Sequence, residues 1–252
     1  MHSPAAPLHD RAELKNLNLT TAGAACAVLT TLSFVVGIAL MGSSGVQALI
    51  PDTGASALDW IKDVDDAGGM FFAGAWLAII GGGFAIIAFV GFWSALRQAS
   101  DLMILGPILG AVGMTLVTIS HLLPIAMAYE LVPGYVVATG ATRESLTVTT
   151  DTLASLALVL NYTGDVIVWG VVVPLFSWAV LKTNLLPRWI GWLGIITAFF
   201  AGWLGAAAPA SRQLEDATFI GFVAFFVWMA AMGLALLRRR PRIEELAPAS
   251  VQ

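Results

Sequence analysis

Six long apolar runs constrain the fold of this sequence more than any other feature. Each holds at least about 20 mostly apolar residues, the length that a helix needs to cross roughly 30 Å of hydrocarbon. The runs are continuous rather than alternating, which favours helices over the strands of a barrel. They cover residues 19–41, 70–93, 102–128, 152–181, 189–208 and 218–237. We therefore predict an all-α, single-domain bundle of six transmembrane helices.

The composition agrees with lipid as the solvent of this chain. Hydrophobic residues make up 58% of the sequence and charged residues 11%, whereas soluble domains carry about a quarter charged residues. Cys26 is the single cysteine, so the chain forms no internal disulfide and contains no Cys-x-x-Cys motif. The only dense basic run, residues 238–240, does not make a nucleic-acid face. Membrane lipids are the expected partners, and nucleic acid is not.

The distribution of positive charges predicts the orientation of the bundle. Six spans place both termini on one side of the membrane, and cytoplasmic loops carry an excess of Lys and Arg. With the termini inside, the inner side holds Arg11, Lys15, Arg97, Lys182, Arg188, Arg238, Arg239, Arg240 and Arg242, and the outer side holds Lys62, Arg143 and Arg212. Both termini are therefore expected to be cytoplasmic.

The membrane domain is predicted to cover residues 17–240, with cytoplasmic tails at residues 1–16 and 241–252. The N-terminal tail is polar and contains proline, so we expect it to be poorly ordered or to lie on the membrane surface. The apolar run at residues 17–41 is too long for a signal-peptide core of roughly 7–15 residues, so it is expected to be a retained span.

The first long outer connection is expected to contain a short amphipathic helix at residues 55–66. Leu58, Ile61 and Val64 recur at three-residue spacing and would share one face. Trp60 would then sit at headgroup level. Such a helix is either a lid over the outer end of the bundle or an ordinary interfacial loop helix.

Two further features of the chain predict local backbone structure. Residues 131–150, the core of the second long outer connection, are too short and too broken to span the membrane and are expected to be loop. Pro107 and Pro174 are expected to bend the third and fourth spans, because a proline inside a helix removes one backbone hydrogen bond.

Small residues recur at four-residue spacing in three of the spans. The stripes are Gly74, Ala78 and Gly82; Gly106 and Gly110; and Gly194, Ala198, Gly202 and Ala206. In lipid such stripes allow helix backbones to approach closely. They serve either tight packing within the bundle or contact with a second copy or another protein. In the latter case the chain would be an accessory or scaffolding subunit of a membrane complex.

Asp165 lies inside the fourth apolar run. A carboxylate in a span is costly, and by default it marks a functional site or a buried structural pair. Asn161, Asp165 and Trp169 share one helical face, with Tyr162 beside them. The polar side chains of this face are therefore expected to line a binding site or to hold neighbouring helices in register.

His121 in the third span is the expected partner of this face. Counting about 1.5 Å per residue from the inner ends of the two spans places Asp165 roughly 6–10 Å below the outer boundary, and His121 near that boundary. Thr115, Thr118 and His121 follow one another in three-residue steps and are expected to share a face. We predict an outward-facing polar pocket, with Asp165, Asn161, Tyr162, His121 and Thr118 as its ligand-binding residues.

Three interpretations of this pocket remain open. It binds a small or lipid-like ligand, or it binds a proton or another cation through Asp165. Alternatively, His121 and Asp165 form an acid–base pair in an intramembrane enzyme that acts on a lipid or isoprenoid substrate. In the third interpretation Asp165 is hydrogen-bonded to its neighbours and only holds the helices together.

No metal or cofactor is expected. His121 is the only histidine in a span, and His2 and His9 lie in the N-terminal tail on the other side of the membrane. This arrangement excludes bis-histidine haem and three-histidine zinc sites. Nucleophilic triads, Rossmann fingerprints and Walker motifs are also missing, so the sequence identifies no class of enzyme.

The segment LPRWIGWLG, residues 186–194, opens the fifth span. Pro187 suits the start of a helix, and Trp189 and Trp192 suit the membrane interface. Together with the six-span layout, this segment resembles a recurring segment in uncharacterised bacterial six-helix integral membrane proteins, a family catalogued as a domain of unknown function. The resemblance implies the fold and a bacterial inner membrane, and it implies no activity and no catalytic residues.

Overall fold

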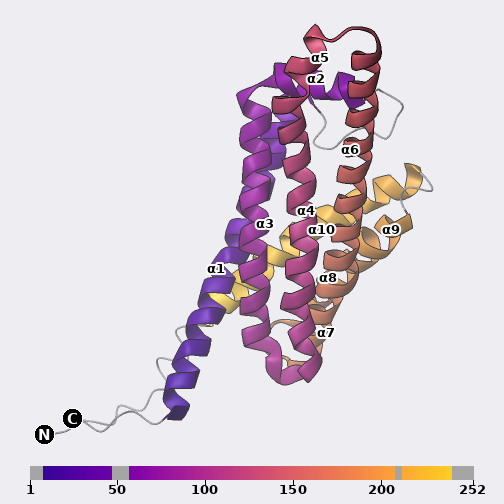
Figure 1. The fold of residues 1–252 in the computed structure, drawn as a ribbon. Coiled ribbons are helices and arrows are strands. Elements are labelled where there is room, and N and C mark those ends of the chain that lie inside the picture. Colours follow the sequence, from indigo (N-terminus) through magenta and orange to yellow (C-terminus); the bar gives the residue numbers. More distant parts are fainter. Residues whose placement is uncertain (1–7, 47–56, 208–211, 240–252) are drawn as a thin grey trace, which may run out of the picture.

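The computed structural model describes residues 8–46, 57–207 and 212–239. These residues form helices and contain no strand. Six helices are long and apolar enough to cross a membrane: Leu19–Ser43, Gly69–Ala99, Asp101–Val137, Gly140–Thr183, Arg188–Ala207 and Thr218–Arg238. The predicted fold, an all-α membrane bundle of six spanning helices, is confirmed (Figure 1).

The helices follow one another as a series of long rods and short connecting turns. In chain order they are α1 (Leu8–Ser43), α2 (Ala57–Ala67), α3 (Gly69–Leu96), the 3-10 turns η1 (Arg97–Ala99) and η2 (Asp101–Ile104), α4 (Leu105–Glu130), α5 (Val132–Val137), α6 (Gly140–Ile167), η3 (Val168–Val172), α7 (Val173–Thr183), α8 (Arg188–Thr197), η4 (Ala198–Leu204), α9 (Gly205–Ala207) and α10 (Arg212–Arg238). The segments η3 and η4 are π-helical. In Figure 1, α10 runs obliquely behind α3 and α4 towards α1.

Helix α1 begins at Leu8, earlier than expected. Residues 8–16 continue the first spanning helix as helix, although they were predicted to belong to the N-terminal tail. Residues 1–7 and the predicted C-terminal tail at 241–252 lie outside the described residues.

Glycines bring α1 and α3 into backbone contact. A Cβ atom added at Gly91 would lie 2.5 Å from the Cα of Gly23, and one added at Gly74 would lie 2.5 Å from the carbonyl oxygen of Gly37. Real Cβ atoms do not approach other atoms so closely, so only glycine permits these crossings. Close backbone approach of this kind replaces the hydrophobic driving force that lipid cannot supply.

The small-residue stripes are used within the chain. Gly106 on α4 faces the ring of Phe176, Gly110 faces Phe89, and Gly202 on η4 faces the backbone of Gly170 on η3. Each stripe therefore packs one helix of the bundle against another, which agrees with the interpretation that the stripes serve packing within the bundle.

Helix α2 confirms the predicted amphipathic helix, but its tryptophan lies elsewhere than expected. Trp60 is 3% exposed and meets the ring of Phe71 edge-on at 6.0 Å, whereas it was predicted to sit at headgroup level. The reason is that α2 does not lie flat on a lipid surface. It packs across the ends of α3, α4 and α6, with Ile61 and Val64 fully buried, and Leu58 lies among the residues whose side chains are not described.

Residues 131–150 are helical, so the prediction of a loop was wrong. They form α5 and the first turns of α6. The start of α6 is rich in Ser and Thr, and such a composition favours the prediction of a loop, because these side chains compete with the helix for backbone hydrogen bonds. In the structure they satisfy their own helix: the hydroxyl of Thr147 donates to the carbonyl of Arg143 at 3.0 Å, and that of Thr150 to the carbonyl of Leu146 at 2.8 Å.

Together α2, α5 and the first turns of α6 close one end of the bundle, which we call the capped end (Figure 1). Tyr135 on α5 lies at its centre, with the Lys62 ammonium 5.1 Å and the Arg143 guanidinium 4.4 Å from its ring centroid. The helix from Gly140 to Thr183 has 44 residues. At 1.5 Å per residue it measures about 66 Å, twice the roughly 30 Å of a hydrocarbon core. A helix of this length exceeds the hydrocarbon core, and its charged first turns, with Arg143, Glu144 and Asp151, lie at the capped end, which is therefore the end expected outside the lipid.

The two prolines expected to bend spans behave differently. Pro107 occupies the first turn of α4, where its missing N–H costs no hydrogen bond, so it does not interrupt the helix. Pro174 occupies the first turn of α7, directly after the π-helical η3. The fourth span thus departs from regular α-helix beside Pro174. The carbonyl of Gly170 in η3 accepts a hydrogen bond from Trp203 Nε1 at 3.1 Å.

Candidate functional site

A partly open cavity of about 480 Å³ lies within the bundle and is lined by α1, α3, α4, α6, η3 and α10. Most of its wall is apolar, and one side is polar. The lining residues are Phe34, Ile38, Met41, Ala78, Met114, Val117, His121, Asn161, Tyr162, Asp165, Val168, Trp169, Thr218, Phe219, Phe222, Phe225 and Phe226. Four of the five residues predicted to form the site, His121, Asn161, Tyr162 and Asp165, therefore meet at one cavity.

Asn161 is the centre of the polar side. It is 6% exposed, and its side chain makes hydrogen bonds in two directions. Its Nδ2 donates to Asp165 Oδ2 at 2.8 Å, one helical turn further along α6. Its Oδ1 accepts from Ser120 Oγ of α4 at 3.1 Å. The amide thus fixes the position of the Asp165 carboxyl group and ties α6 to α4.

His121 is oriented by its own helix. Its Nδ1 lies 2.8 Å from the carbonyl oxygen of Val117. A carbonyl oxygen can only accept, so Nδ1 carries the hydrogen in this bond. In a neutral imidazole the other nitrogen, Nε2, is then a hydrogen-bond acceptor. The second oxygen of an ionised Asp165 carboxylate, Oδ1, is likewise an acceptor, and neither atom has a hydrogen bond to any other residue that the structure describes.

Thr118 and Thr115 do not line the cavity, although Thr118 was predicted to belong to the pocket and Thr115 to share its face. The hydroxyl of Thr118 faces α3, where a Cβ added at Gly82 would lie 2.7 Å from its Oγ1. Thr115 is exposed on the outside of the bundle. Three-residue steps fall about 60° short of a full helical turn, so two such steps rotate a side chain by about 120°. The face shared by Thr115, Thr118 and His121 was therefore too broad to point in one direction.

Ser120 is a member of the site that the sequence analysis missed. It is fully buried, and its single hydroxyl hydrogen has two acceptors within reach, Asn161 Oδ1 at 3.1 Å and the carbonyl of Val117 at 2.7 Å. A signal was present, because Ser120 lies seven residues beyond Gly113 and so continues the small-residue stripe of α4. Gly113 packs directly against Gly164 of α6.

The aromatic wall was also missed. Phe222 and Phe225 of α10 lie 5.7 Å and 5.8 Å from the ring of Trp169 on η3. Phe226 packs against Phe222 at 4.7 Å and against Phe34 of α1 at 5.6 Å. These rings surround the space beside the Asp165 carboxyl group, and their faces attract cations.

Ser120→Ala should lower the stability of the bundle by about 1 kcal/mol, the range of hydrogen bonds between membrane helices. The substitution removes the only donor from α4 to Asn161 among the described residues. Thermal unfolding can be followed through the reaction of a thiol dye with Cys26, which is partly buried in α1.

The matched control for this variant is Ser155→Ala. Ser155 is exposed, and its hydroxyl donates only to the carbonyl of Asp151 in its own helix. If both variants melt at the temperature of the wild type, the bond between Ser120 and Asn161 does not hold α4 and α6 together.

The described residues contain no group of three or more His, Cys, Asp or Glu side chains that could hold a metal ion. The polar side of the cavity offers one imidazole, one carboxyl group, one amide and one phenol, with hydroxyls from Ser120 and Thr218 nearby. Such a set suits the recognition of a small polar head group rather than a metal.

The fold and the cavity define a polytopic helical membrane protein with one polar strip inside an aromatic-lined bundle. The sequence profile of the family described as "Domain of unknown function (DUF4386)" matches residues 21–234. The chain belongs to this family. The match runs from the first spanning helix to the last and confirms the resemblance found in the sequence. Comparisons with curated proteins and with solved structures found no match.

Proposed function

We propose that this protein binds a small amphiphile in the inner cavity, with a cationic or hydrogen-donating head group on Asp165 and His121. The observation that carries the proposal is the pair of acceptors, Asp165 Oδ1 and His121 Nε2, on one side of an otherwise apolar cavity. A ligand that donates to both completes their hydrogen bonding. At about 480 Å³ the cavity has the size of ordinary ligand pockets, which range over roughly 300–1,000 Å³.

Electrostatics favour a cation among such ligands. An ionised carboxylate inside a span is costly unless an opposite charge accompanies it. Asp165 has no basic partner among the described residues; its one hydrogen bond comes from the neutral amide of Asn161. Trp169 and Phe222 line the same cavity as Asp165, and aromatic rings are a second source of attraction for an ammonium group. The apolar part of the ligand would lie among the phenylalanines.

The two alternative functions have less support. His121 and Asp165 are not hydrogen-bonded to each other. A general acid and base usually lie within hydrogen-bonding reach of the group on which they act, and this structure shows no such arrangement between the two side chains. A scaffolding subunit would need free contact surfaces, and the small-residue stripes already pack inside the bundle.

We further propose that the protein lies in a bacterial cytoplasmic membrane with both termini in the cytoplasm. The support comes from the charge distribution. Lys182 reaches Ala99, and Arg238 lies across one hollow from Pro187, so the basic inner-loop residues gather at the end opposite the cap. Under the positive-inside rule this basic end faces the cytoplasm.

The test measures binding of four probes with the same ten-carbon chain: N-methyldecylamine, decylamine, decanol and decanoate. The full chain in a neutral detergent should be stabilised by the two amines, less by decanol, and not by decanoate, as read by Cys26 labelling during heating. In Asp165→Asn the affinity for the amines should fall by about 2 kcal/mol or more, or roughly 30-fold, because the charge partner is lost.

Glu130→Gln is the matched control, because Glu130 is an exposed carboxylate at the end of α4. It should bind the amines as the wild type does. Equal affinity for the amines in Asp165→Asn and the wild type, or a preference for decanoate, would show that the cavity does not recognise cations.

A further inference from the structure

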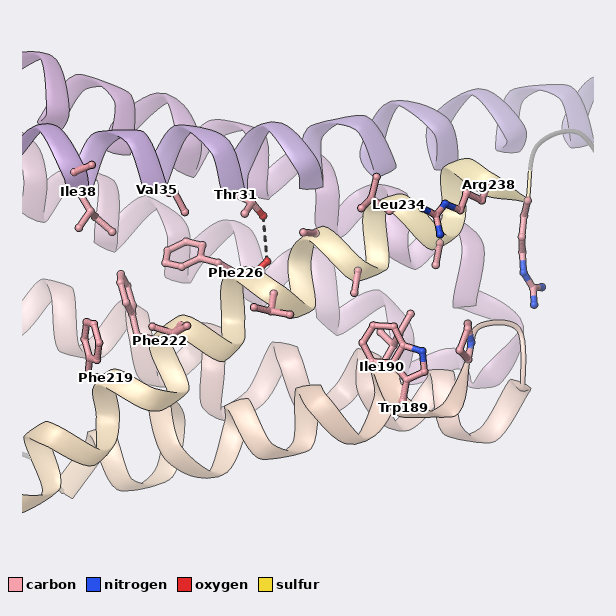
Figure 2. Close-up of a pocket in the computed structure, with 18 residues that line it drawn as sticks. Thr31, Val35, Ile38, Trp189, Ile190, Phe219, Phe222, Phe226, Leu234 and Arg238 are labelled. Carbon is pink, nitrogen blue, oxygen red and sulfur yellow. Dashed lines mark hydrogen bonds between the residues drawn. The ribbon is translucent and has the colours of Figure 1, made fainter.

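A second hollow lies on the outside of the bundle, between α1, α8 and α10 (Figure 2). It is an open groove of about 1,000 Å³ that follows α10. Phe219 and Phe222 lie at one end and Arg238 at the other, with Trp189 and Ile190 of α8 forming the opposite wall (Figure 2). Apart from the two arginines and Thr31, the lining is entirely apolar.

We propose that this groove is a binding site for one anionic phospholipid of the bilayer. The phosphate lies on Arg238 and Arg239, and an acyl chain follows α10 towards Phe226. This inference goes beyond the proposed function, because it concerns a different surface and a different ligand. It stands whether or not the inner cavity binds an amphiphile.

One end of the groove is basic, because Arg238 and Arg239 line it. Arg238 and Arg239 are exposed and form no salt bridge with another residue in the described part of the chain. Lys182, at the same end of the bundle, is already used: its ammonium donates to the carbonyl of Ala99 at 2.8 Å and lies 4.7 Å from the centroid of the Trp178 ring. The two arginines are therefore available to bind a phosphate, for which guanidinium groups are well suited.

The length of the groove is similar to the thickness of one lipid leaflet. Arg238 and Phe226 are twelve residues apart on α10, which corresponds to about 18 Å of helix at 1.5 Å per residue. Half of a hydrocarbon core is about 15 Å thick. A lipid with its phosphate at the arginines would therefore place its acyl chain along the groove within one leaflet.

Small side chains widen the groove along part of its wall. Ala230, Ala231 and Ala235 line the groove where α10 passes α1 and α8, and their small side chains leave the space that a chain would fill. Thr31 Oγ1 of α1 lies 3.3 Å from the carbonyl oxygen of Phe226, to which it can donate, and this contact joins α1 to α10 part of the way along the groove (Figure 2). The stretch between the arginines and this contact therefore has the room that an acyl chain needs.

The test is lipid binding by native mass spectrometry of the full chain in a neutral detergent. Dioleoylphosphatidylglycerol and dioleoylphosphatidylcholine are titrated against the wild type and Arg238→Gln/Arg239→Gln. The wild type should prefer the anionic lipid, and the double variant should lose about tenfold in affinity for it. The reason is that each basic residue near a membrane surface adds its own attraction for anionic lipid, and the variant removes two. Arg97→Gln/Arg188→Gln is the matched control, because it removes two exposed arginines that do not line the groove.

A second variant tests the position of the acyl chain. Ala231→Phe fills the groove and should weaken binding of both lipids several-fold, whereas Ala73→Phe, at an exposed position of α3, should not. Labelling of Cys26 during heating verifies that each variant is folded. The proposal is overturned if the two double variants lose the anionic lipid equally, if the wild type binds both lipids equally, or if Ala231→Phe binds as the wild type does.

Discussion

Gly91→Leu is expected to disrupt the pairing of α1 with α3 and to lower the stability of the bundle by about 3 kcal/mol or more. Overpacking a well-filled core typically costs 1–3 kcal/mol. Here the cost lies at or above the top of that range, because the added Cβ would lie 2.5 Å from the Cα of Gly23. A backbone cannot turn away as a side chain can, so the two helices must separate.

The measurement is again thermal unfolding followed through Cys26. A loss of about 3 kcal/mol should lower the melting temperature by roughly 10 °C in a protein of this size. Gly83→Leu is the matched control on the same helix, because a Cβ added at Gly83 would meet no atom within 4 Å. This variant should melt at or above the temperature of the wild type, since leucine favours helix over glycine. Equal melting of the two variants would mean that α1 and α3 do not cross at Gly23 and Gly91.

Phe176→Ala is expected to lower the stability by about 2–3 kcal/mol. The ring of Phe176 is fully buried, stacks on Phe89 at 6.1 Å and meets Phe92 edge-on at 5.7 Å. In soluble cores such a truncation costs about 3–5 kcal/mol, part of which is transfer out of water. In lipid the transfer part largely disappears, and the lost packing contacts remain.

Phe199→Ala is the control for this variant. Phe199 is 46% exposed on the outside of η4, so its removal exposes neighbouring atoms to lipid or detergent and leaves no cavity. The two variants should therefore differ clearly in melting temperature. A small effect of Phe176→Ala, similar to that of Phe199→Ala, would contradict the close packing of Phe176 against Phe89 and Phe92.

The spanning helices could be predicted because lipid imposes a minimum length on every apolar run. Five of the six spanning segments begin within a few residues of the predicted positions, although helix α1 itself starts earlier, at Leu8, and the fourth segment begins at Gly140 rather than near residue 152. That difference has a physical reason: the first turns of α6 project beyond the lipid, so hydropathy carries no information about them. They are helical because of their packing against α2 and α5.

The candidate site was only partly predictable. Asp165 and His121 could be found because polar side chains in a span are rare and costly. The direction in which each side chain points was harder to predict, and Thr118 was placed in the cavity although it faces Gly82. Ser120 was missed because a serine in an apolar run is inexpensive and gives no strong signal. The phenylalanines of α10 could not be assigned, because aromatic residues suit lipid, core and cavity equally well.

The π-helical segment η3, Val168–Val172, sets the phase between the two halves of the fourth span. A π turn takes in one residue more than an α turn, and one residue corresponds to about 100° of helix rotation. In an unbroken α-helix the eleven residues from Asp165 to Phe176 would turn through about 1,100°, which is about 20° more than three full turns, so both side chains would lie on nearly the same face. The additional residue turns Phe176 away from that face, so a single rod presents a carboxyl group to the inner cavity and, about three turns later, a ring to Phe89 and Phe92 of α3.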